Sequence, residues 1–206
     1  MIKEKPDKYT WANSPAVSKH TWNIMKSKKH TDDVYIKHFV RLLHGTLPTK
    51  SKIWKHKTKE RKSKGFYEKE THFWNDKYRH VRDNKCTLCG MVEETVDHLH
   101  KCHHTEVKNI RDYMQRKIQL AIGPCWIWFT TNYPNFTGCQ FPTSWGNMGV
   151  IPVTLESKLP TDLDPSQVAL LLTKVQKYTI KASLKIWNLR NQKLFGRYNM
   201  HKQHPP

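Results

Sequence analysis

Three cysteines and one histidine lie within seventeen residues, at spacings typical of metal ligands. Cys86 and Cys89 form a C-x2-C pair, and the small Gly90 that follows lets backbone amides approach the sulfurs. His98 and Cys102 are four residues apart, so on a helix they share one face and can reach the same ion. Because soft thiolates favour Zn²⁺, the pattern C-x2-C-x8-H-x3-C predicts one closed, structural zinc site.

Some alternatives at this site stay open. His103 or His104 could replace one ligand, and the cluster could also be a set of reduced thiols without metal. Cys125 and Cys139 have no partner pair at metal-binding spacing, so we expect buried free thiols there. A catalytic zinc would need an open position and a general base, and the deaminase pattern H-x-E…P-C-x-x-C is absent. We therefore expect the zinc to order residues 84–104, which have little apolar content of their own.

The chain is strongly basic. Its 206 residues include 36 Lys and Arg against 17 Asp and Glu, a net charge of +19. Residues 1–85 carry a net +13, and the densest run, residues 50–64 (KSKIWKHKTKERKSK), has eight cations and one acid. Because a polyanion would relieve this repulsion and release counterions, the pattern predicts nucleic-acid binding. A solvated helix face and a nuclear-import address are the other interpretations of this run.

We expect the contacts to be mainly to phosphates, with little sequence preference. Aromatic residues lie among the cations, where they can either stack on bases or pack as core; Phe73 and Trp74 favour core, and Trp54 fits both roles. The candidate nucleic-acid contacts are Lys50, Lys52, Trp54, Lys55, Lys57, Arg61, Lys62, Arg79 and Arg82.

Hydrophobic periodicity and capping residues predict a mostly α fold: a small helical domain with a zinc-stapled CCHC knuckle insert and a long C-terminal helix. We expect a helix from Ser14-Pro15 to about residue 28, one starting near Asp33 and stopped by Gly45, and a basic one over residues 50–62. Residues 94–103 are expected to be helical. Thr105 should cap an amphipathic helix ended by Gly123-Pro124, and Asp164-Pro165 should start the last helix, whose apolar face runs from Val168 to Leu189 until Gly196. In that helix we expect Trp187 in the core, and Arg190 and Asn191 as capping or packing residues.

The expected segments differ in composition. Residues 123–162 contain five prolines and four glycines and hardly any basic residues, which predicts a loop-rich connector with one or two short strands. The longest apolar stretch, 121–129, is too short to span a bilayer, and the N-terminus has no apolar signal segment. The expected organisation is an N-terminal basic helical segment (1–30), a zinc-binding domain (31–122), the connector (123–162), the long helix (163–197) and a tail (198–206).

Four motifs together resemble the zinc-binding region that lies downstream of the reverse transcriptase core in non-LTR retrotransposons. They occur in the family's order. The first and last would be weak alone, whereas the middle two are quite specific. They are Leu42-Leu43-His44-Gly45-Thr46-Leu47-Pro48-Thr49, Cys86-Thr87-Leu88-Cys89-Gly90, Glu93-Glu94-Thr95-Val96-Asp97-His98-Leu99 through Cys102, and Ile186-Trp187-Asn188-Leu189-Arg190-Asn191 through Phe195.

The resemblance implies that Cys86, Cys89, His98 and Cys102 bind zinc, and that the region helps a polymerase engage its RNA template or DNA target. The chain has no polymerase core, so it looks like a detached C-terminal fragment or a remnant of such a polyprotein. A reverse transcriptase core supplied in trans is a candidate partner. A membrane partner is not expected, and we expect an intracellular location, with the nucleus favoured over the cytoplasm.

We expect no catalytic activity. Asp32-Asp33 begin a helical pattern instead of lying between apolar strands, so they do not match the paired aspartates of a polymerase. Glu156-Ser157-Lys158 matches the E-x-K half of a restriction-like endonuclease site, but no Pro-Asp precedes it. A ribonuclease H site would need four converging carboxylates, for which the chain offers no scaffold. The leading hypothesis is a non-catalytic zinc- and nucleic-acid-binding fragment; the alternatives are a protein-interaction module with a structural zinc and an endonuclease remnant.

Overall fold

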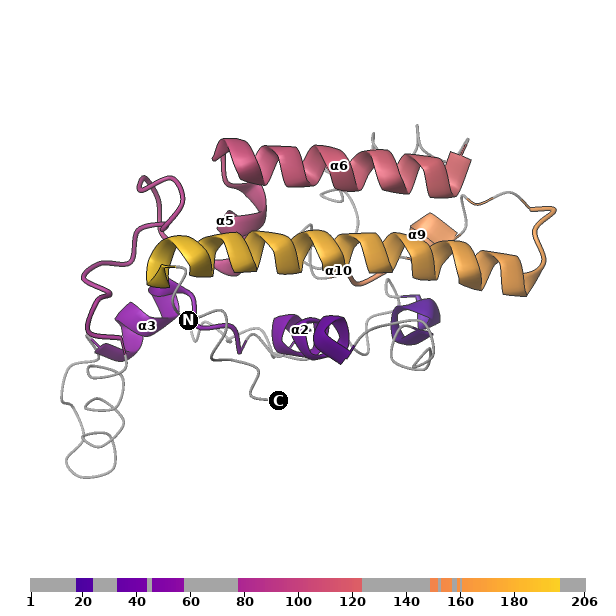
Figure 1. Ribbon diagram of the computed structural model, residues 1–206. Coiled ribbons are helices and arrows are strands. Elements are labelled where there is room, and N and C mark those ends of the chain that lie inside the picture. Colours follow the sequence, from indigo (N-terminus) through magenta and orange to yellow (C-terminus); the bar gives the residue numbers. More distant parts are fainter. Residues whose placement is uncertain are drawn as a thin grey trace, which may run out of the picture. The chain divides into compact units, whose positions relative to one another are not determined.

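The protein is mostly helical (Figure 1), as the sequence predicts. The computed structural model describes residues 18–23, 33–43, 46–57, 78–123, 149–151, 153–156, 159 and 161–196. Within these ranges there is no β-strand, only an isolated bridge between Lys85 and Glu93. The helical elements in chain order are η1 (Lys19–Trp22), α2 (Asp33–Leu43), α3 (Lys50–Lys57), α5 (Val96–Lys101), α6 (Thr105–Ile122), α9 (Val153–Glu156) and α10 (Pro165–Phe195).

The chain divides into two compact units, each built from two stretches of sequence. Unit 1 comprises Met1–Thr46 and Asn109–Lys185, and unit 2 comprises residues 47–108 and 186–206. The boundaries differ from the expected segments because two of them fall inside helices α6 and α10. As a result, residues 31–122 contribute to both units instead of forming one.

The core of unit 1 lies along helix α10. Leu172, Val175 and Ala182 recur at the helical period and are buried against Met114 and Ile118 of α6, together with Ile151, Leu155 and Leu159. This confirms the apolar face that the sequence predicts. Fully burying a Leu or Ile side chain contributes about 1.5–3 kcal/mol, so this cluster is a main source of stability in unit 1. None of the helices in the described ranges has the length and apolarity needed to cross a membrane.

Polar contacts attach the N-terminal part of unit 1 to α10. Gln176, which is fully buried, donates from Nε2 to the carbonyls of Thr21 (2.7 Å) and Gly149 (2.8 Å). The Ser18 amide donates to the Ile151 carbonyl at 2.8 Å. On α2, His38 Nε2 lies 3.0 Å from Ser183 Oγ of α10, and both side chains are buried.

The predicted helix from Ser14 to residue 28 is wrong at Ser18. Ser18 is extended, with ψ 139°, and its side chain accepts from the His20 amide, so it caps the separate short helix η1. The hydroxyl competes with helical backbone bonding, which ends any helix arriving from its N-terminal side. Residues 14–17 and 24–28 lie outside the described ranges.

Two other helix starts differ from expectation. Helix α5 covers six residues instead of 94–103, because Thr95 is extended and its side chain accepts from the His98 amide as the N-cap. Thr105 is the first residue of α6 instead of its cap. In the connector, residues 153–156 form the helical turn α9. Residues 124–148 lie outside the described ranges, so the short strands expected in the connector stay a prediction.

One apolar cluster of unit 2 lies around helix α3. Ile53 of α3 packs with Tyr78 and Val81, and Leu194 and Phe195 at the end of α10 lie against them. Gly196 then ends α10 with φ +71°, a left-handed conformation that glycine adopts without strain, as predicted. Trp187 is half-buried instead of a core residue.

Candidate metal centre

The loop after Lys85 is a tight turn closed by backbone hydrogen bonds. The Cys86 amide donates to the Val92 carbonyl at 2.7 Å, and the Gly90 amide donates to the Cys86 carbonyl at 2.8 Å. Gly90 has φ +71°, which confirms the need for glycine at this position. The Leu88 amide lies 3.4 Å from Cys86 Sγ, so a backbone donor faces the sulfur. We call residues 85–93 the knuckle.

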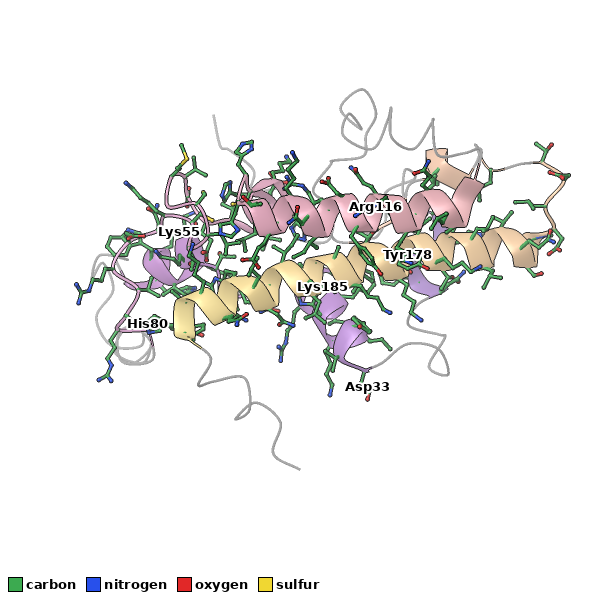
Figure 2. All side chains as sticks on the ribbon, turned by 45° about the horizontal axis from the view of Figure 1, so that its top comes forward. Asp33, Lys55, His80, Arg116, Tyr178 and Lys185 are labelled. Carbon is green, nitrogen blue, oxygen red and sulfur yellow. The ribbon has the colours of Figure 1, made fainter. Side chains whose placement is uncertain are left out.

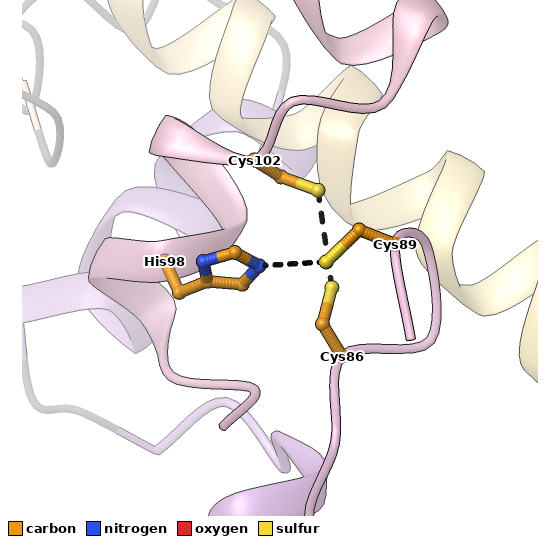
Figure 3. Close-up of side chains that lie close together, drawn as sticks. All are labelled: Cys86, Cys89, His98 and Cys102. Atoms are coloured by element: carbon orange, nitrogen blue, oxygen red, sulfur yellow. Dashed lines mark hydrogen bonds between the residues drawn. The ribbon is translucent and has the colours of Figure 1, made fainter. Parts of the chain in front are cut away.

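Four side chains from the knuckle and α5 converge on one point (Figure 3). The ligand atoms of Cys86, Cys89, His98 and Cys102 all lie within 4.8 Å of one another. Cys86 Sγ and Cys102 Sγ are 3.9 Å apart, and Cys89 Sγ lies 3.4 Å from His98 Nε2. Cys86 and Cys102 are buried, with 2% and 0% exposure. The cluster can hold one metal ion, and it joins the two residue pairs that the sequence predicts.

The thiols of the cluster differ in acidity. Burial raises the pKa of Cys86 to about 12, and burial also raises the pKa of Cys102. Burial acts in the same direction on Cys89, but hydrogen bonds from the Met91 amide and from His98 outweigh it and lower its pKa to about 6. The cluster thus combines one thiol of lowered pKa with two of raised pKa, and because the thiolate is the form that binds metal, metal binding here would depend on pH.

The remaining candidate ligands stand apart from the cluster. Among the described residues, the group that could hold an ion consists of Cys86, Cys89, His98 and Cys102 and does not include His103 or His104. His103 is exposed. Cys125 and Cys139 lie outside the described ranges, so the expectation of buried free thiols there stays a prediction.

A buried carboxylate that the sequence did not single out joins the knuckle to two helices. Glu94 is fully buried; its Oε2 accepts from the Thr87 amide (2.9 Å) and hydroxyl (2.6 Å), and its Oε1 accepts from the Lys50 amide at 2.7 Å. The last contact places a negative charge at the N-terminus of α3, where the unpaired amides and the helix dipole favour it. Thus one side chain fixes the knuckle against the start of the basic helix.

The partner of Glu94 is Arg190 on α10, which is also fully buried. Its Nη2 and Nε lie 2.6 and 2.9 Å from Glu94 Oε1, and Nη2 also donates to the Pro48 carbonyl at 3.2 Å. The guanidinium stacks over Trp187, with Cζ 4.8 Å from the ring centre. The predicted packing role of Arg190 is confirmed. Its partner was missed because the pair is 96 residues apart in sequence.

Lys193, one turn further along α10, donates from Nζ to the Leu88 carbonyl at 2.9 Å. Because Leu88 lies between the two knuckle cysteines, this contact orients the C-x2-C turn from outside the cluster. The last turns of α10 therefore hold the metal centre in place through Arg190 and Lys193.

The predicted nucleic-acid contacts have different environments. Lys50 donates to Asp83 Oδ1 at 2.6 Å, and its side chain is only 12% exposed, so its ammonium is already paired with a carboxylate. Lys55 is 73% exposed, with Glu93 Oε1 3.4 Å away. Lys52 and Trp54 are half-buried. Arg61, Lys62 and the side chain of Lys57 lie outside the described ranges.

Arg79 and Arg82 are exposed on the segment that leads into the knuckle. Tyr78 and Val81 on the same segment point into the core of unit 2, so alternation of buried and exposed residues turns both arginines outward. Lys85, which was not predicted, is exposed three residues further on. None of these three cations forms an ion pair with a described residue. Because Arg79, Arg82 and Lys85 follow one another every three residues, this spacing could have identified Lys85 as a third candidate contact.

Among the aromatic residues that lie between the cations, Phe66, Tyr67, Phe73 and Trp74 lie outside the described ranges, whereas Tyr78 is buried and belongs to the core. The possible nuclease residue Glu156 ends α9, and neither its side chain nor Lys158 is among the described parts.

No protein-family model matches the chain, and neither the curated proteins nor the solved structures contain a significant match to it.

Proposed function

We propose that the chain binds one zinc ion structurally and binds nucleic acid through the cations of unit 2, without catalysis of its own. The observation that carries the proposal is the Cys3His cluster next to the exposed cations Arg79, Arg82 and Lys85, which form no ion pair with a described residue. A tetrahedral zinc with Zn–S bonds of about 2.3 Å and a Zn–N bond of about 2.0 Å would separate its sulfurs by about 3.8 Å and a sulfur and nitrogen by about 3.5 Å. The distances of 3.9 and 3.4 Å in the cluster suit that geometry.

Four closed ligands, with no position left for a reactant, suit a structural ion. The zinc would hold the knuckle and α5 in the positions from which Glu94 reaches α3 and α10. The ordered knuckle would in turn present the nearby cations to a phosphate backbone.

We further propose descent from the zinc-binding region of a non-LTR retrotransposon polyprotein. In support, residues from the four similar motifs contact one another inside unit 2: Glu94 bonds to Thr87 and Arg190, and Arg190 bonds to the Pro48 carbonyl. Such a fragment would bind RNA or DNA in the nucleus, and a reverse transcriptase core supplied in trans is its candidate partner.

The test of the zinc centre is metal content, measured by native and denaturing mass spectrometry. We expect one zinc per chain in the wild type, loss of zinc in Cys86→Ser, and retention in the control Cys139→Ser. A metal-free, fully reduced wild type that keeps its helical content would contradict the zinc centre.

The test of nucleic-acid binding is fluorescence anisotropy with a labelled oligonucleotide over a range of salt concentrations. We expect the logarithm of the affinity to fall with log salt by about 0.9 per phosphate contact on duplex DNA, and by about 0.7 on a single strand. Arg79→Gln/Arg82→Gln should weaken binding more than the control Lys101→Gln/Lys108→Gln, which removes the same charge. Affinity that does not change with salt would exclude phosphate contacts.

A protein-interaction module is the second candidate, favoured by exposed apolar side chains on two helices. Leu170 of α10 is 56% exposed and Leu120 of α6 is 80% exposed. If Arg79→Gln/Arg82→Gln no longer binds nucleic acid but still binds a protein partner through Leu170, the chain has both activities. If the wild type binds no nucleic acid at any salt concentration, the interaction module becomes the better description.

A further inference from the structure

A row of lysines follows one face of helix α10 within unit 1. Lys174, Lys177, Lys181 and Lys185 are separated by three, four and four residues, so they form a single stripe about 16 Å long. Residues 165–195 contain no Asp or Glu, so no acid on this helix neutralises the row.

The stripe lies on the side of α10 opposite the packed face. Leu172, Val175 and Ala182 are buried in the core of unit 1, whereas Lys174 and Lys185 are exposed. Figure 2 labels Lys185 on this helix. Lys177 and Lys181 are half-buried. The row therefore lies away from the apolar core of unit 1.

Tyrosine rings from two other helices flank the row. Lys181 Nζ lies 5.2 Å from the centre of the Tyr35 ring of α2, and Lys185 Nζ lies 5.0 Å from that of Tyr113 of α6. Lys117 of α6 reaches the Tyr113 ring as well, at 5.5 Å. Lys117, Lys181 and Lys185 form no ion pair with any residue in the described parts of the chain.

The ammonium groups of Lys117 and Lys185 lie at one ring and have no ion-pair partner among the described residues, so an anion would be a favourable ligand there. Tyr113 is 47% exposed, so a planar ligand can reach its ring. Cations that follow a backbone and aromatic faces that accept bases are the two features of single-strand binding surfaces. A cation–π contact at an exposed position is weak, so a stacking base can displace the ammonium, which then moves to a phosphate.

We propose that Lys117, Lys181 and Lys185, with Tyr35 and Tyr113, form a second nucleic-acid surface that prefers single strands. The choice of nucleic acid as ligand rests on the proposed function, but none of these residues belongs to the contacts proposed in unit 2. The two surfaces would engage separate parts of one strand, or two different strands.

The experiment measures binding of the full zinc-loaded chain to labelled oligothymidine and to a duplex of equal length. Lys117→Gln/Lys181→Gln/Lys185→Gln should weaken single-strand binding about tenfold and make the salt slope shallower by about 2, since each phosphate contact contributes about 0.7. The control Lys19→Gln/Lys37→Gln/Arg116→Gln removes the same charge from exposed positions of unit 1 and should have a much smaller effect.

A tyrosine pair tests the stacking role separately from charge. Tyr113→Phe keeps the ring and should bind within about twofold of the wild type, whereas Tyr113→Leu should lose at least about fivefold on the single strand and little on the duplex. Circular dichroism checks that each variant retains its helices.

Equal losses in the lysine triple and its control would overturn the second surface, because net charge alone would then explain them. Normal binding by the lysine triple variant, together with weakened binding by Arg79→Gln/Arg82→Gln, would also overturn the second surface and would support the unit 2 surface. Weakened binding by the lysine triple, together with normal binding by the arginine variant, would support the second surface and contradict the unit 2 surface. Binding to anionic vesicles but to neither oligonucleotide would contradict both.

Discussion

Glu93 and Glu94 are neighbours in the sequence, yet the fold gives them opposite environments. Glu94 is fully buried and accepts from Thr87, Lys50 and Arg190, whereas the side chain of Glu93 is 43% exposed beside Lys55. Contacts with Ser51 and Lys55 lower the pKa of Glu93, with the Ser51 hydroxyl as the larger cause. Replacing each glutamate by glutamine therefore compares the loss of a buried charge, at Glu94, with the loss of a surface charge, at Glu93.

We predict that Glu94→Gln lowers the free energy of unfolding by about 3–5 kcal/mol, because it leaves the Arg190 guanidinium buried without a counter-charge. The control Glu93→Gln should change it by less than about 1 kcal/mol, as for an exposed pair. Urea denaturation of the zinc-loaded proteins measures both values. Similar losses at the two positions would show that the buried pair has no special role.

Gly149 allows a second comparison between matched residues. It has φ +87°, and a Cβ there would lie 2.7 Å from Cγ1 of Ile180 on α10. Gly123 also has positive φ, at +52°, but a Cβ there would have nothing within 4 Å. Alanine would therefore cause backbone strain at both positions, but only at position 149 would its Cβ also clash with Ile180.

We predict that Gly149→Ala destabilises the protein by about 1–3 kcal/mol more than Gly123→Ala, the usual range for overpacking a core. The backbone strain common to both variants is about 1–2 kcal/mol. Thermal unfolding followed by circular dichroism compares them. Equal unfolding temperatures for the two alanine variants would contradict this prediction, because they would mean that the Ile180 side chain can shift to accommodate a Cβ at position 149.

At the scale of elements, the start of α10 depends on one carboxylate. Asp164 Oδ1 accepts from the amides of Ser166 (2.7 Å) and Gln167 (3.1 Å) and from the Ser166 hydroxyl, while Gln167 Oε1 accepts from the Asp164 amide at 3.0 Å. This reciprocal pair is the capping box that the sequence predicts. The Ser166 hydroxyl, followed by the two amides, lowers the pKa of Asp164 below its ordinary 3.8.

The lowered pKa predicts a pH dependence for the start of this helix. The carboxylate stabilises the folded state above about pH 4, and this stabilisation is lost as the pH falls through the lower folded-state value. Asp164→Asn should retain the cap without this pH dependence, and Asp164→Ala should fray at every pH. Amide exchange of residues 166–168 between pH 6 and 3 measures the effect. A wild type and an Asn variant with the same pH profile would contradict it.

Local patterns predicted the elements better than they predicted the contacts between them. The 3.6-residue period of α10, its Asp164-Pro165 start and the stop at Gly196 are properties of adjacent residues, so the sequence contains them in full. The metal ligands were predictable for the same reason, since Cys86 and Cys102 lie on one short stretch. The Glu94–Arg190 pair and the burial of Lys50 depend on chain segments that meet only in the folded protein.

At the scale of the whole molecule, the two units should respond differently to loss of metal. The apolar core along α10 belongs to unit 1, whereas the Cys3His cluster belongs to unit 2. Zinc would thus contribute to the stability of unit 2 above all.

We predict that a chelator increases amide hydrogen exchange at residues 86–102 and 50–57, while residues 172–182 keep their protection. Adding zinc back should restore the original pattern, which hydrogen-exchange mass spectrometry can follow peptide by peptide. Cys86→Ser should resemble the chelated protein, and Cys139→Ser should resemble the zinc-loaded one. Uniform loss of protection in both units would mean that they unfold as one cooperative body.

The discontinuity of unit 2 has a consequence for synthesis of the chain on the ribosome. All four metal ligands have been translated by Cys102, but Arg190 and Lys193 follow only after the remaining stretch of unit 1. At ordinary elongation rates this delay is on the order of ten seconds. The nascent knuckle can bind its ion as soon as Cys102 is available, whereas the Glu94 carboxylate has no ion-pair partner until Arg190 has been translated. Unit 2 can therefore complete its folding only after Arg190 and Lys193 have been translated.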